Sequence, residues 1–174
     1  AVQRLAQERV GCAVFGVGFR LRPDTHRVVH RVKYGGFPSQ GRALGQWMAQ
    51  GWPAPPRDVV LVPVPLHWRR LVRRGFNPPQ ALAEGLATGW GCEVQPKLLR
   101  RLKHRVSLTS ATRAARLSAL RGTFGVREYW RTAHPERVVL VDDVLTTGAT
   151  FRACQQVLGA EGVQVVGGVW LAMG

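Results

Sequence analysis

The architecture of this chain follows from one segment, Val138-Val139-Leu140-Val141-Asp142-Asp143-Val144-Leu145-Thr146-Thr147-Gly148-Ala149-Thr150. Four apolar residues open it, and three of them are β-branched valines, which is typical of a strand buried on both faces. Two adjacent carboxylates and a short loop rich in hydroxyl groups follow. Apolar residues then recur at helical spacing from Phe151 to Leu158. The segment therefore predicts a buried strand, a phosphate-sized loop and the start of a helix.

The loop at residues 146–150 has the features of an anion site. The first backbone N–H groups of a helix that begins near Gly148 have no partner inside the helix, and the helix dipole adds partial positive charge there. The threonines add hydroxyl donors, and the glycine lets the backbone approach a phosphate closely. Asp142 and Asp143 would repel a phosphate, so they suit a sugar diol or a metal ion better. Together these features predict a ligand of the ribose 5-phosphate type.

Residues 139–150 resemble the signature with which type I phosphoribosyltransferases bind 5-phosphoribosyl 1-diphosphate (PRPP): a hydrophobic strand, two acids, two apolar residues and Thr-Thr-Gly-x-Thr. The resemblance implies that Asp142 and Asp143 are catalytic and hold the ribose hydroxyls. It implies a PRPP-binding set of Asp142, Asp143, Thr146, Thr147, Gly148, Ala149 and Thr150. The alternative is a buried strand that ends in a solvated Asp-Asp turn before an ordinary helix. The coincidence of several residue types in order favours the first interpretation.

A second apolar run, at residues 59–65, predicts another central parallel strand, and its prolines end the strand. A basic loop, residues 66–77, follows at the strand end, the edge where open α/β sheets bind ligands. A wider resemblance, to the competence protein F family (also called ComF or GntX-like), rests on residues 62–67, 73–77, 33–35 and 120–124. This resemblance covers nearly the whole chain from Arg27 onward.

The family resemblance implies transfer of a 5-phosphoribosyl group with release of pyrophosphate, in a protein linked to DNA uptake during natural transformation. Mg²⁺ is expected as cofactor through PRPP, without a dedicated metal site on the protein. The residues expected to bind pyrophosphate are Val64, Pro65, Arg73, Arg74, Lys103 and Arg105. One alternative function stays open: a non-catalytic adaptor on the same fold that senses PRPP or binds single-stranded DNA.

The charge of the chain is strongly unbalanced, with 25 Lys and Arg against 10 Asp and Glu and a net charge of +15. Nine cations and no acid lie between Glu93 and Glu128. Such a positive field attracts polyanions, although a solvated basic face is the simpler interpretation of any single arginine. Two interpretations of residues 101–120 stay open: a loop that covers PRPP, or a basic surface that tracks single-stranded DNA.

The order of the expected elements predicts an α/β fold, a mostly parallel twisted sheet with helices on both faces. By resemblance this is the type I phosphoribosyltransferase fold. Residues 1–56 are expected to form a small N-terminal hood-like element, and residues 57–174 the phosphoribosyltransferase core. Within the first segment, the glycine-rich residues 9–22 predict a hairpin, and Ser39 is the expected N-cap of a helix that ends at Gly51.

The remaining features concern the cellular compartment, metal content and partners of the protein. Its three cysteines, Cys12, Cys92 and Cys154, are far apart, which favours reduced thiols in a cytoplasmic protein. The four-cysteine zinc ribbon that family members often carry is not found, and no histidine has metal-ligand spacing, so no protein-bound metal is expected. No apolar run approaches membrane-spanning length, so we expect no membrane insertion. The expected partners are PRPP and, on the alternative interpretation, single-stranded DNA or the DNA-uptake machinery; the oligomeric state stays open.

Overall fold

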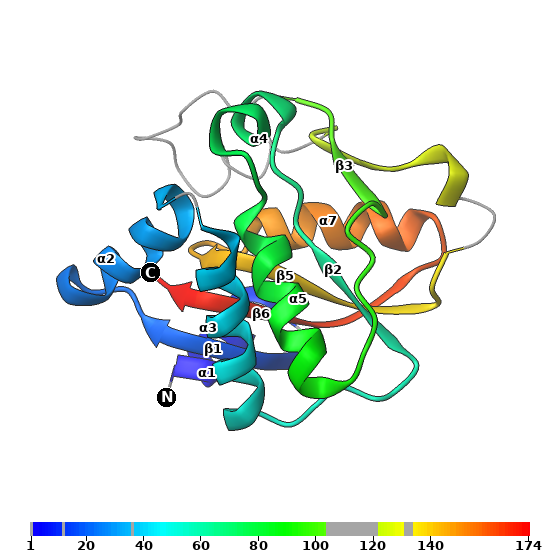
Figure 1. Cartoon of the computed structure of the whole chain (residues 1–174). Helices are drawn as coiled ribbons and strands as arrows, with labels where there is room; N and C mark the ends of the chain where they lie inside the picture. The colour runs from blue at the N-terminus through cyan, green and yellow to red at the C-terminus, as the bar shows by residue number, and fades with distance from the viewer. Residues whose placement is uncertain (1, 12, 36, 104–121, 131–133) are drawn as a thin grey trace.

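A computed structural model describes residues 2–11, 13–35, 37–103, 122–130 and 134–174, shown in Figure 1. The elements are α1 (Val2–Val10), β1 (Ala13–Arg20), α2 (Pro23–Tyr34), α3 (Pro38–Gly51), β2 (Val59–Pro63), α4 (Trp68–Arg74), α5 (Pro78–Trp90), β3 (Leu99–Arg101), β4 (Phe124–Val126), the 3-10 turn η1 (Glu128–Trp130), β5 (Arg137–Leu145), α7 (Ala149–Ala160) and β6 (Gln164–Met173).

The centre of the molecule is a four-stranded sheet with strand order β1-β6-β5-β2. All of its strand pairs are parallel, and β3 pairs with β4 in a separate antiparallel ribbon. Helices α3 and α5 lie on one face of the sheet and α7 on the other (Figure 1). The predicted α/β fold, with a mostly parallel sheet covered on both faces, is confirmed.

Strand β5 is the central element of both hydrophobic cores. Val138 and Leu140 point into a core that also holds residues of α1, α7 and the β3–β4 ribbon. Val139 and Val141 point into the other core, which contains residues of α2, α3 and α5. Each of these four side chains is at most 1% exposed, and full burial of a Val or Leu stabilises the fold by about 1.5–3 kcal/mol. The continuous apolar run is therefore required by burial on both sides.

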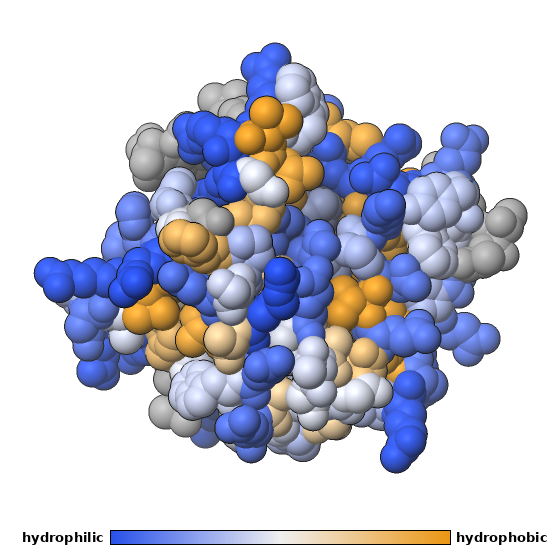
Figure 2. All heavy atoms as spheres, in the orientation of Figure 1, coloured by the Kyte–Doolittle hydropathy of each residue, from blue (hydrophilic) through white to orange (hydrophobic). Residues whose placement is uncertain are grey.

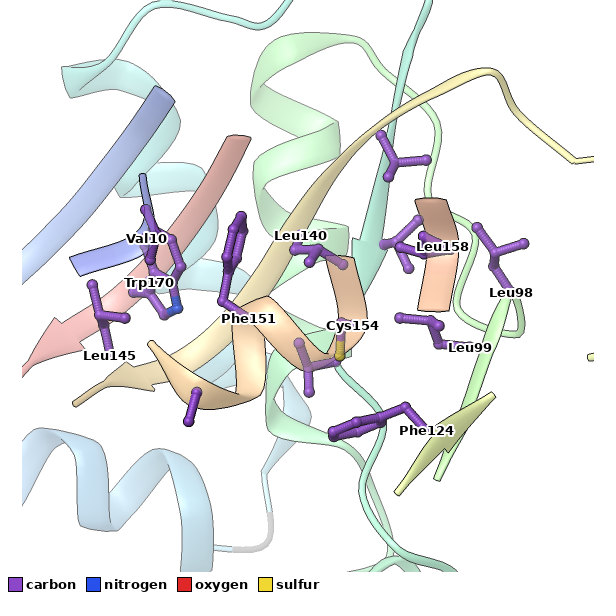
Figure 3. Packing of buried hydrophobic residues seen from close by; sticks show 14 of the residues in the cluster. Val10, Leu98, Leu99, Phe124, Leu140, Leu145, Phe151, Cys154, Leu158 and Trp170 are labelled. Atoms are coloured by element: carbon purple, nitrogen blue, oxygen red, sulfur yellow. The ribbon is translucent and has the colours of Figure 1, made fainter. Parts of the chain in front are cut away.

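Helix α7 closes the first core directly behind the loop at residues 146–148. Its buried side chains Phe151, Cys154 and Leu158 gather with Leu140 and Trp170 (Figure 3). The ring centroids of Phe151 and Trp170 lie 5.5 Å apart in a tilted arrangement. The helical spacing seen in the sequence thus packs α7 against the sheet and places its N-terminus beside the end of β5.

The N-terminal segment joins the same sheet as the rest of the chain. Strand β1 pairs in parallel with β6, and α3 packs closely along α5. A Cβ added at Gly45 would lie 2.3 Å from the carbonyl oxygen of Leu82, and one at Gly85 would lie 2.0 Å from that of Arg42. These contacts require glycine because the two helix backbones touch. The expected boundary near residue 57 therefore separates two stretches of sequence that share a sheet and a core.

Two local predictions in this segment were wrong. The glycine-rich residues 9–22 do not form a hairpin, because the partner of β1 is β6 at the opposite end of the chain. A Cβ at Gly16 would lie 2.8 Å from the ring of Trp52, so this glycine serves close packing rather than a turn. Helix α3 has Phe37 and not Ser39 at its N-cap, because the helix begins at Pro38, two residues before the start that a Ser39 cap would give.

In the part of the chain that the structure describes, no helix combines the length and apolar character needed to cross a membrane.

Candidate functional site

The site begins where strand β2 leaves the sheet while β5 continues. Pairing of β2 with β5 ends at Pro63 and Val141, whereas β5 stays paired with β6 as far as Leu145. The chain after β2 is still tied to the end of β5 by a 2.8 Å hydrogen bond from the Val64 amide to the Val141 carbonyl. Beyond this point β5 has a neighbour on one side only. A crevice at the carboxyl edge of the sheet results, as expected for a ligand site in an open α/β fold.

A pocket of about 240 Å³ fills this crevice. Its walls come from α2, the β2–α4 connection, α4, α5, β3, the end of β5 and the start of α7. The lining residues are Lys33, Val64, Pro65, Leu66, Arg70, Arg74, Pro79, Arg101, Asp142, Asp143, Val144, Thr146 and Thr150. The two acids and two of the loop threonines predicted from the sequence thus share one pocket.

Asp142 lines the pocket and is half-buried. Its Oδ1 accepts a 2.8 Å hydrogen bond from the backbone N–H of Asp143. Burial raises the pKa of Asp142 above its ordinary value of 3.8, and the neighbouring charge of Asp143 raises it further; the charges of Lys33 and Arg101 act in the opposite direction. These cations limit the rise without cancelling it, and the pKa of Asp142 reaches about 8.

Asp143 forms an ion pair that closes one side of the pocket. Its Oδ2 lies 3.0 Å from Nζ of Lys33, and the two side chains are only 16% and 24% exposed. Lys33 reaches the acid from the last turn of α2, an element of the N-terminal segment. An ion pair with this degree of burial is less screened by water than a surface pair. It fixes the orientation of the carboxylate and links α2 to the site.

The loop after β5 presents its threonines in two directions. Thr146 and Thr150 line the pocket. Thr147 instead accepts a 3.4 Å hydrogen bond at Oγ1 from the Ala149 amide in the first turn of α7. Gly148, the N-cap, adopts the left-handed region with φ 73°. Both Gly148 and Ala149 are buried and are not among the lining residues, so only their backbone could contact a ligand.

The reason for glycine at position 148 differs from the one expected. The sequence suggested that glycine lets a phosphate approach. A Cβ added there would instead lie 2.8 Å from the carbonyl oxygen of Arg9 and 3.0 Å from Nη1 of Arg152. Neither of these residues lines the pocket. Glycine is thus required by its positive φ and by tight packing behind the loop.

Four of the residues that line the pocket are cationic. They are Lys33 from α2, Arg70 and Arg74 from α4, and Arg101 from β3. The guanidinium of Arg74 stacks 4.5 Å from the ring centroid of Tyr34, and its buried Nε has no hydrogen-bond partner among the described residues. The guanidinium of Arg101 lies 5.2 Å from the ring of Phe124. Stacking on aromatic rings helps to position both guanidinium groups.

Helix α4 is held in place by its ends. Nδ1 of His67 caps it by accepting a 3.3 Å hydrogen bond from the Arg69 amide, and Gly75 ends it with φ 77°. The side chain of Asn77 then donates a 3.1 Å hydrogen bond to the Val64 carbonyl at the end of β2. Residues 73–77, which fit the family pattern, therefore have a structural role. They bring the chain back to the end of β2 and leave Arg74 lining the pocket.

The residues expected to bind pyrophosphate lie in different places. Val64, Pro65 and Arg74 line the pocket. Arg73 and Lys103 are exposed and are not among its lining residues. Arg105 falls outside the described residues, as does most of the segment at 101–120 that was expected to cover PRPP or track DNA.

Sequence reasoning did not place three cations that line the pocket, Lys33, Arg70 and Arg101. For Lys33 a signal existed, because Lys33-Tyr34-Gly35 had been noted as part of a family-like pattern. Arg70 lies in the basic loop that follows β2, at the predicted ligand edge. Arg101 had no distinguishing signal among the nine cations between Glu93 and Glu128.

Comparison with known proteins finds relatives that carry two different names. The chain is 31% identical over 155 residues to the DNA utilization protein YhgH of Salmonella typhi, which covers 82% of this chain and 66% of that protein. It is 31% identical over 110 residues to competence protein F of Haemophilus influenzae, which covers 62% of this chain and 48% of that protein. The chain thus spans about half to two thirds of the length of these relatives. No family model matches.

Among solved structures, one titled as the structure of the allosteric regulatory enzyme of purine biosynthesis aligns with a TM-score of 0.49 and 22% sequence identity. The alignment covers 80% of this chain and 30% of that chain.

Proposed function

The chain belongs to the competence protein F family, and on this premise we propose that it binds PRPP and transfers its 5-phosphoribosyl group with release of pyrophosphate. We further propose that this activity serves the use of DNA taken up by the cell, as the names of the relatives suggest.

One observation carries the proposal: the pocket joins an acid pair and threonine hydroxyls to a wall of four cations. PRPP has a phosphate at one end, a vicinal diol in the middle and a pyrophosphate at the other end. Thr146, Thr150 and the N-terminus of α7 suit the 5-phosphate. Asp142 and Asp143 suit the diol. Lys33, Arg70, Arg74 and Arg101 suit the pyrophosphate, which carries the larger negative charge.

Each group would act by holding part of the ligand. The acids accept hydrogen bonds from the ribose hydroxyls and stabilise the positive charge that develops on the ring as the bond from C1 to pyrophosphate breaks. Arg74, held on Tyr34 with its Nε unsatisfied among the described residues, is placed to bind the departing oxygens. The acceptor then forms its bond to C1. Preorganised charges of this kind contribute a large share of catalysis in many enzymes.

The acid pair also fits a Mg²⁺ ion that arrives with the ligand. Mg²⁺ is usually held by one or two carboxylates together with substrate phosphates and water. Asp142 and Asp143 offer adjacent oxygens, although one oxygen of Asp143 is already paired with Lys33. When bound, the ion would neutralise part of the pyrophosphate charge.

Calorimetric titration with three ligands tests the proposal. PRPP, ribose 5-phosphate and inorganic pyrophosphate would be titrated in the presence of Mg²⁺ into the wild type and Asp143→Asn. We expect affinity for PRPP and ribose 5-phosphate to fall about 10- to 100-fold, the effect of losing a hydrogen bond to a charged group. Pyrophosphate affinity should not fall, because the variant removes a negative charge and releases Lys33. Equal PRPP affinity in both proteins would refute the assignment.

A matched control removes a carboxylate from the opposite edge of the sheet. Asp58 pairs with Arg137 at 2.6 Å where β2 and β5 begin. Asp58→Asn changes the net charge as Asp143→Asn does, but Asp58 does not line the pocket. It should therefore leave the three affinities unchanged. Pyrophosphate release from PRPP, measured over a panel of nucleobases and amines, then decides between transfer and binding alone.

A second candidate function is a non-catalytic adaptor that binds single-stranded DNA on the same fold. It is supported by helix α4, which carries basic residues and exposes Trp68, with the guanidinium of Arg69 lying 5.3 Å from the ring centroid. Figure 2 shows a hydrophobic area over this helix within a largely hydrophilic face. Single-strand binders combine aromatic stacking platforms with cations in this way.

The two candidates make opposite predictions for one pair of variants. If the adaptor is correct, fluorescence anisotropy should show salt-dependent binding of an oligonucleotide that weakens about tenfold or more in Trp68→Ala, since stacking contributes about 1–3 kcal/mol per base. The same binding should survive in the Asp142→Asn, Asp143→Asn double variant. Turnover of PRPP with no such DNA affinity would exclude the adaptor.

A further inference from the structure

A second cavity borders the loop at residues 146–148. This cavity has a volume of about 320 Å³ and is lined by Arg9, Thr146, Thr147 and Gly174. Thr146 also lines the ligand pocket, so the loop forms a wall between the two. The groups behind the loop can therefore control its shape without touching a ligand in the pocket.

Two arginines that lie far apart in the sequence, Arg9 and Arg152, donate hydrogen bonds to backbone carbonyls of this loop. Arg152, in the first turns of α7, donates a 2.7 Å hydrogen bond from Nη2 to the carbonyl oxygen of Thr147. Its Nη1 donates to the carbonyl oxygen of Arg9, at the end of α1. The side chain of Arg9 in turn donates to the carbonyl oxygens of Thr146 and Gly174. The loop, α1, α7 and the end of β6 are thus joined by guanidinium contacts.

These contacts determine where the loop amides point. In a trans peptide the N–H points away from the carbonyl oxygen of the same unit, and no cis peptide occurs among the described residues. Because the carbonyls of Thr146 and Thr147 face the arginines, the amides of Thr147 and Gly148 face the other way. Those two amides, next to the N-terminus of α7, are directed away from the cavity lined by Arg9.

The packing around Gly148 is consistent with a loop held from behind. A side chain there would meet Nη1 of Arg152 at 3.0 Å and the carbonyl of Arg9 at 2.8 Å. The arginine contacts and the left-handed φ of 73° therefore belong to one arrangement. A loop held in this way does not need to reorganise when an anion binds.

We propose that Arg152, supported by Arg9, is a positioning residue that holds the carbonyls of the loop at residues 146–148 so that its amides are presented to the 5-phosphate of the ligand. The inference deepens the proposed function and rests on it for the identity of that anion. Arg152 acts through the loop backbone, whereas Lys33 and Arg74 face the ligand directly.

The experiment compares Arg152→Met and Arg152→Lys with the wild type. Methionine keeps much of the aliphatic length and removes every donor, while lysine keeps the charge and one donor group. Arg42→Met is the matched control. Arg42 of α3 forms a 3.1 Å ion pair with Glu84 of α5 and does not line the ligand pocket. Thermal unfolding of each variant first shows that the fold is intact.

Hydrogen–deuterium exchange of the ligand-free proteins gives the first readout. We expect exchange in peptides covering residues 145–151 to be at least about tenfold faster in Arg152→Met, intermediate in Arg152→Lys and unchanged in Arg42→Met, because each 1.4 kcal/mol of local stability changes exchange tenfold. Exchange in peptides from β2 and α5 should stay as in the wild type. Unchanged exchange at residues 145–151 would overturn the proposal, as would faster exchange throughout the chain.

Calorimetry with two ligands gives the second readout. Arg152→Met should bind ribose 5-phosphate about tenfold more weakly and bind inorganic pyrophosphate as the wild type does, because only the first ligand needs the loop. Arg152→Lys should recover part of the loss. Equal losses for both ligands would mean that Arg152 acts as a long-range charge, which contradicts positioning. A wild type that binds neither ligand refutes the proposed function, and the exchange rates then still decide whether Arg152 holds the loop.

Discussion

The two sides of the pocket are built in different ways. The acid and threonine side comes from one continuous segment, the end of β5 and the start of α7. The cationic side is assembled from α2, α4 and β3, whose pocket residues lie between Lys33 and Arg101 in the sequence. The first side is supported by the core of the sheet and by Arg152. The second is placed by aromatic stacking and one ion pair.

This difference indicates that the two sides should respond differently to substitution. A strand, loop and helix packed on a buried core have one conformation, so a change there should affect both ligand affinity and stability. Cations on the rim of a pocket contribute separately, so a change there should affect mainly affinity. The predictions below start with the largest expected effect.

Replacing Gly148 with alanine should have the largest effect. The alanine backbone would have to adopt φ 73°, and its Cβ would lie 2.8 Å from the carbonyl oxygen of Arg9, so the loop must move. We expect the free energy of unfolding to fall by about 1–3 kcal/mol and PRPP affinity to fall by about 100-fold or more. Urea unfolding and calorimetry measure the two quantities.

Gly162→Ala is the matched control for this change. Gly162 has φ 84°, and a Cβ there would meet no atom within 4 Å. This variant should lose about 1 kcal/mol of stability from backbone strain and keep its PRPP affinity. If both glycine variants bind PRPP like the wild type, the acid and threonine side is more tolerant than we propose.

On the cationic side, neighbouring arginines of α4 should differ in effect. Arg74 lines the pocket and stacks on Tyr34, whereas Arg73 is exposed and is not among the lining residues. Arg74→Met should weaken PRPP and pyrophosphate binding by about 10- to 100-fold, with little change in ribose 5-phosphate binding. Arg73→Met should change each affinity less than about threefold. Equal effects in calorimetry would show that the wall acts by its total charge alone.

The last prediction concerns the pH dependence of stability, through the carboxyl of Asp142. Burial raises its pKa above the ordinary 3.8, so the folded protein holds this proton more tightly than the unfolded chain. The resulting stabilisation is present below the ordinary pKa and is lost as the pH rises through the raised value. Asp142→Asn should therefore gain stability relative to the wild type as the pH rises from about 4 towards about 8, by at most about 1.4 kcal/mol per pH unit.

Urea unfolding of both proteins across this range measures the difference. Asp58→Asn is again the control, because the pKa of Asp58 is lowered through its hydrogen bond with Arg137, so its pH dependence has the opposite sign. A stability difference between Asp142→Asn and the wild type that does not change with pH would contradict a raised pKa of Asp142.

Much of the fold could be read from local patterns. The strand at residues 59–63, the strand that carries the acids and helix α7 all follow from runs of apolar residues whose spacing matches their burial. The predicted hairpin failed because glycines in β1 resemble turn residues, whereas their role is to permit contact with Trp52 and with the backbone of β6. That role depends on partners about 35 to 150 residues away, which local patterns do not indicate.

The sequence was sufficient for the acid and threonine side because covalent connection keeps those residues together. Once β5 is a buried strand and α7 packs behind it, Asp142, Asp143 and the loop must lie at one sheet edge. The cationic side is different, since Lys33, Arg74 and Arg101 come to line one pocket only when the chain has folded. In the folded protein, Tyr34 receives the guanidinium group of Arg74 and Phe124 receives that of Arg101. The chain has many similar arginines, and only their positions in the folded protein decide which of them line the pocket. Residue type alone does not identify them.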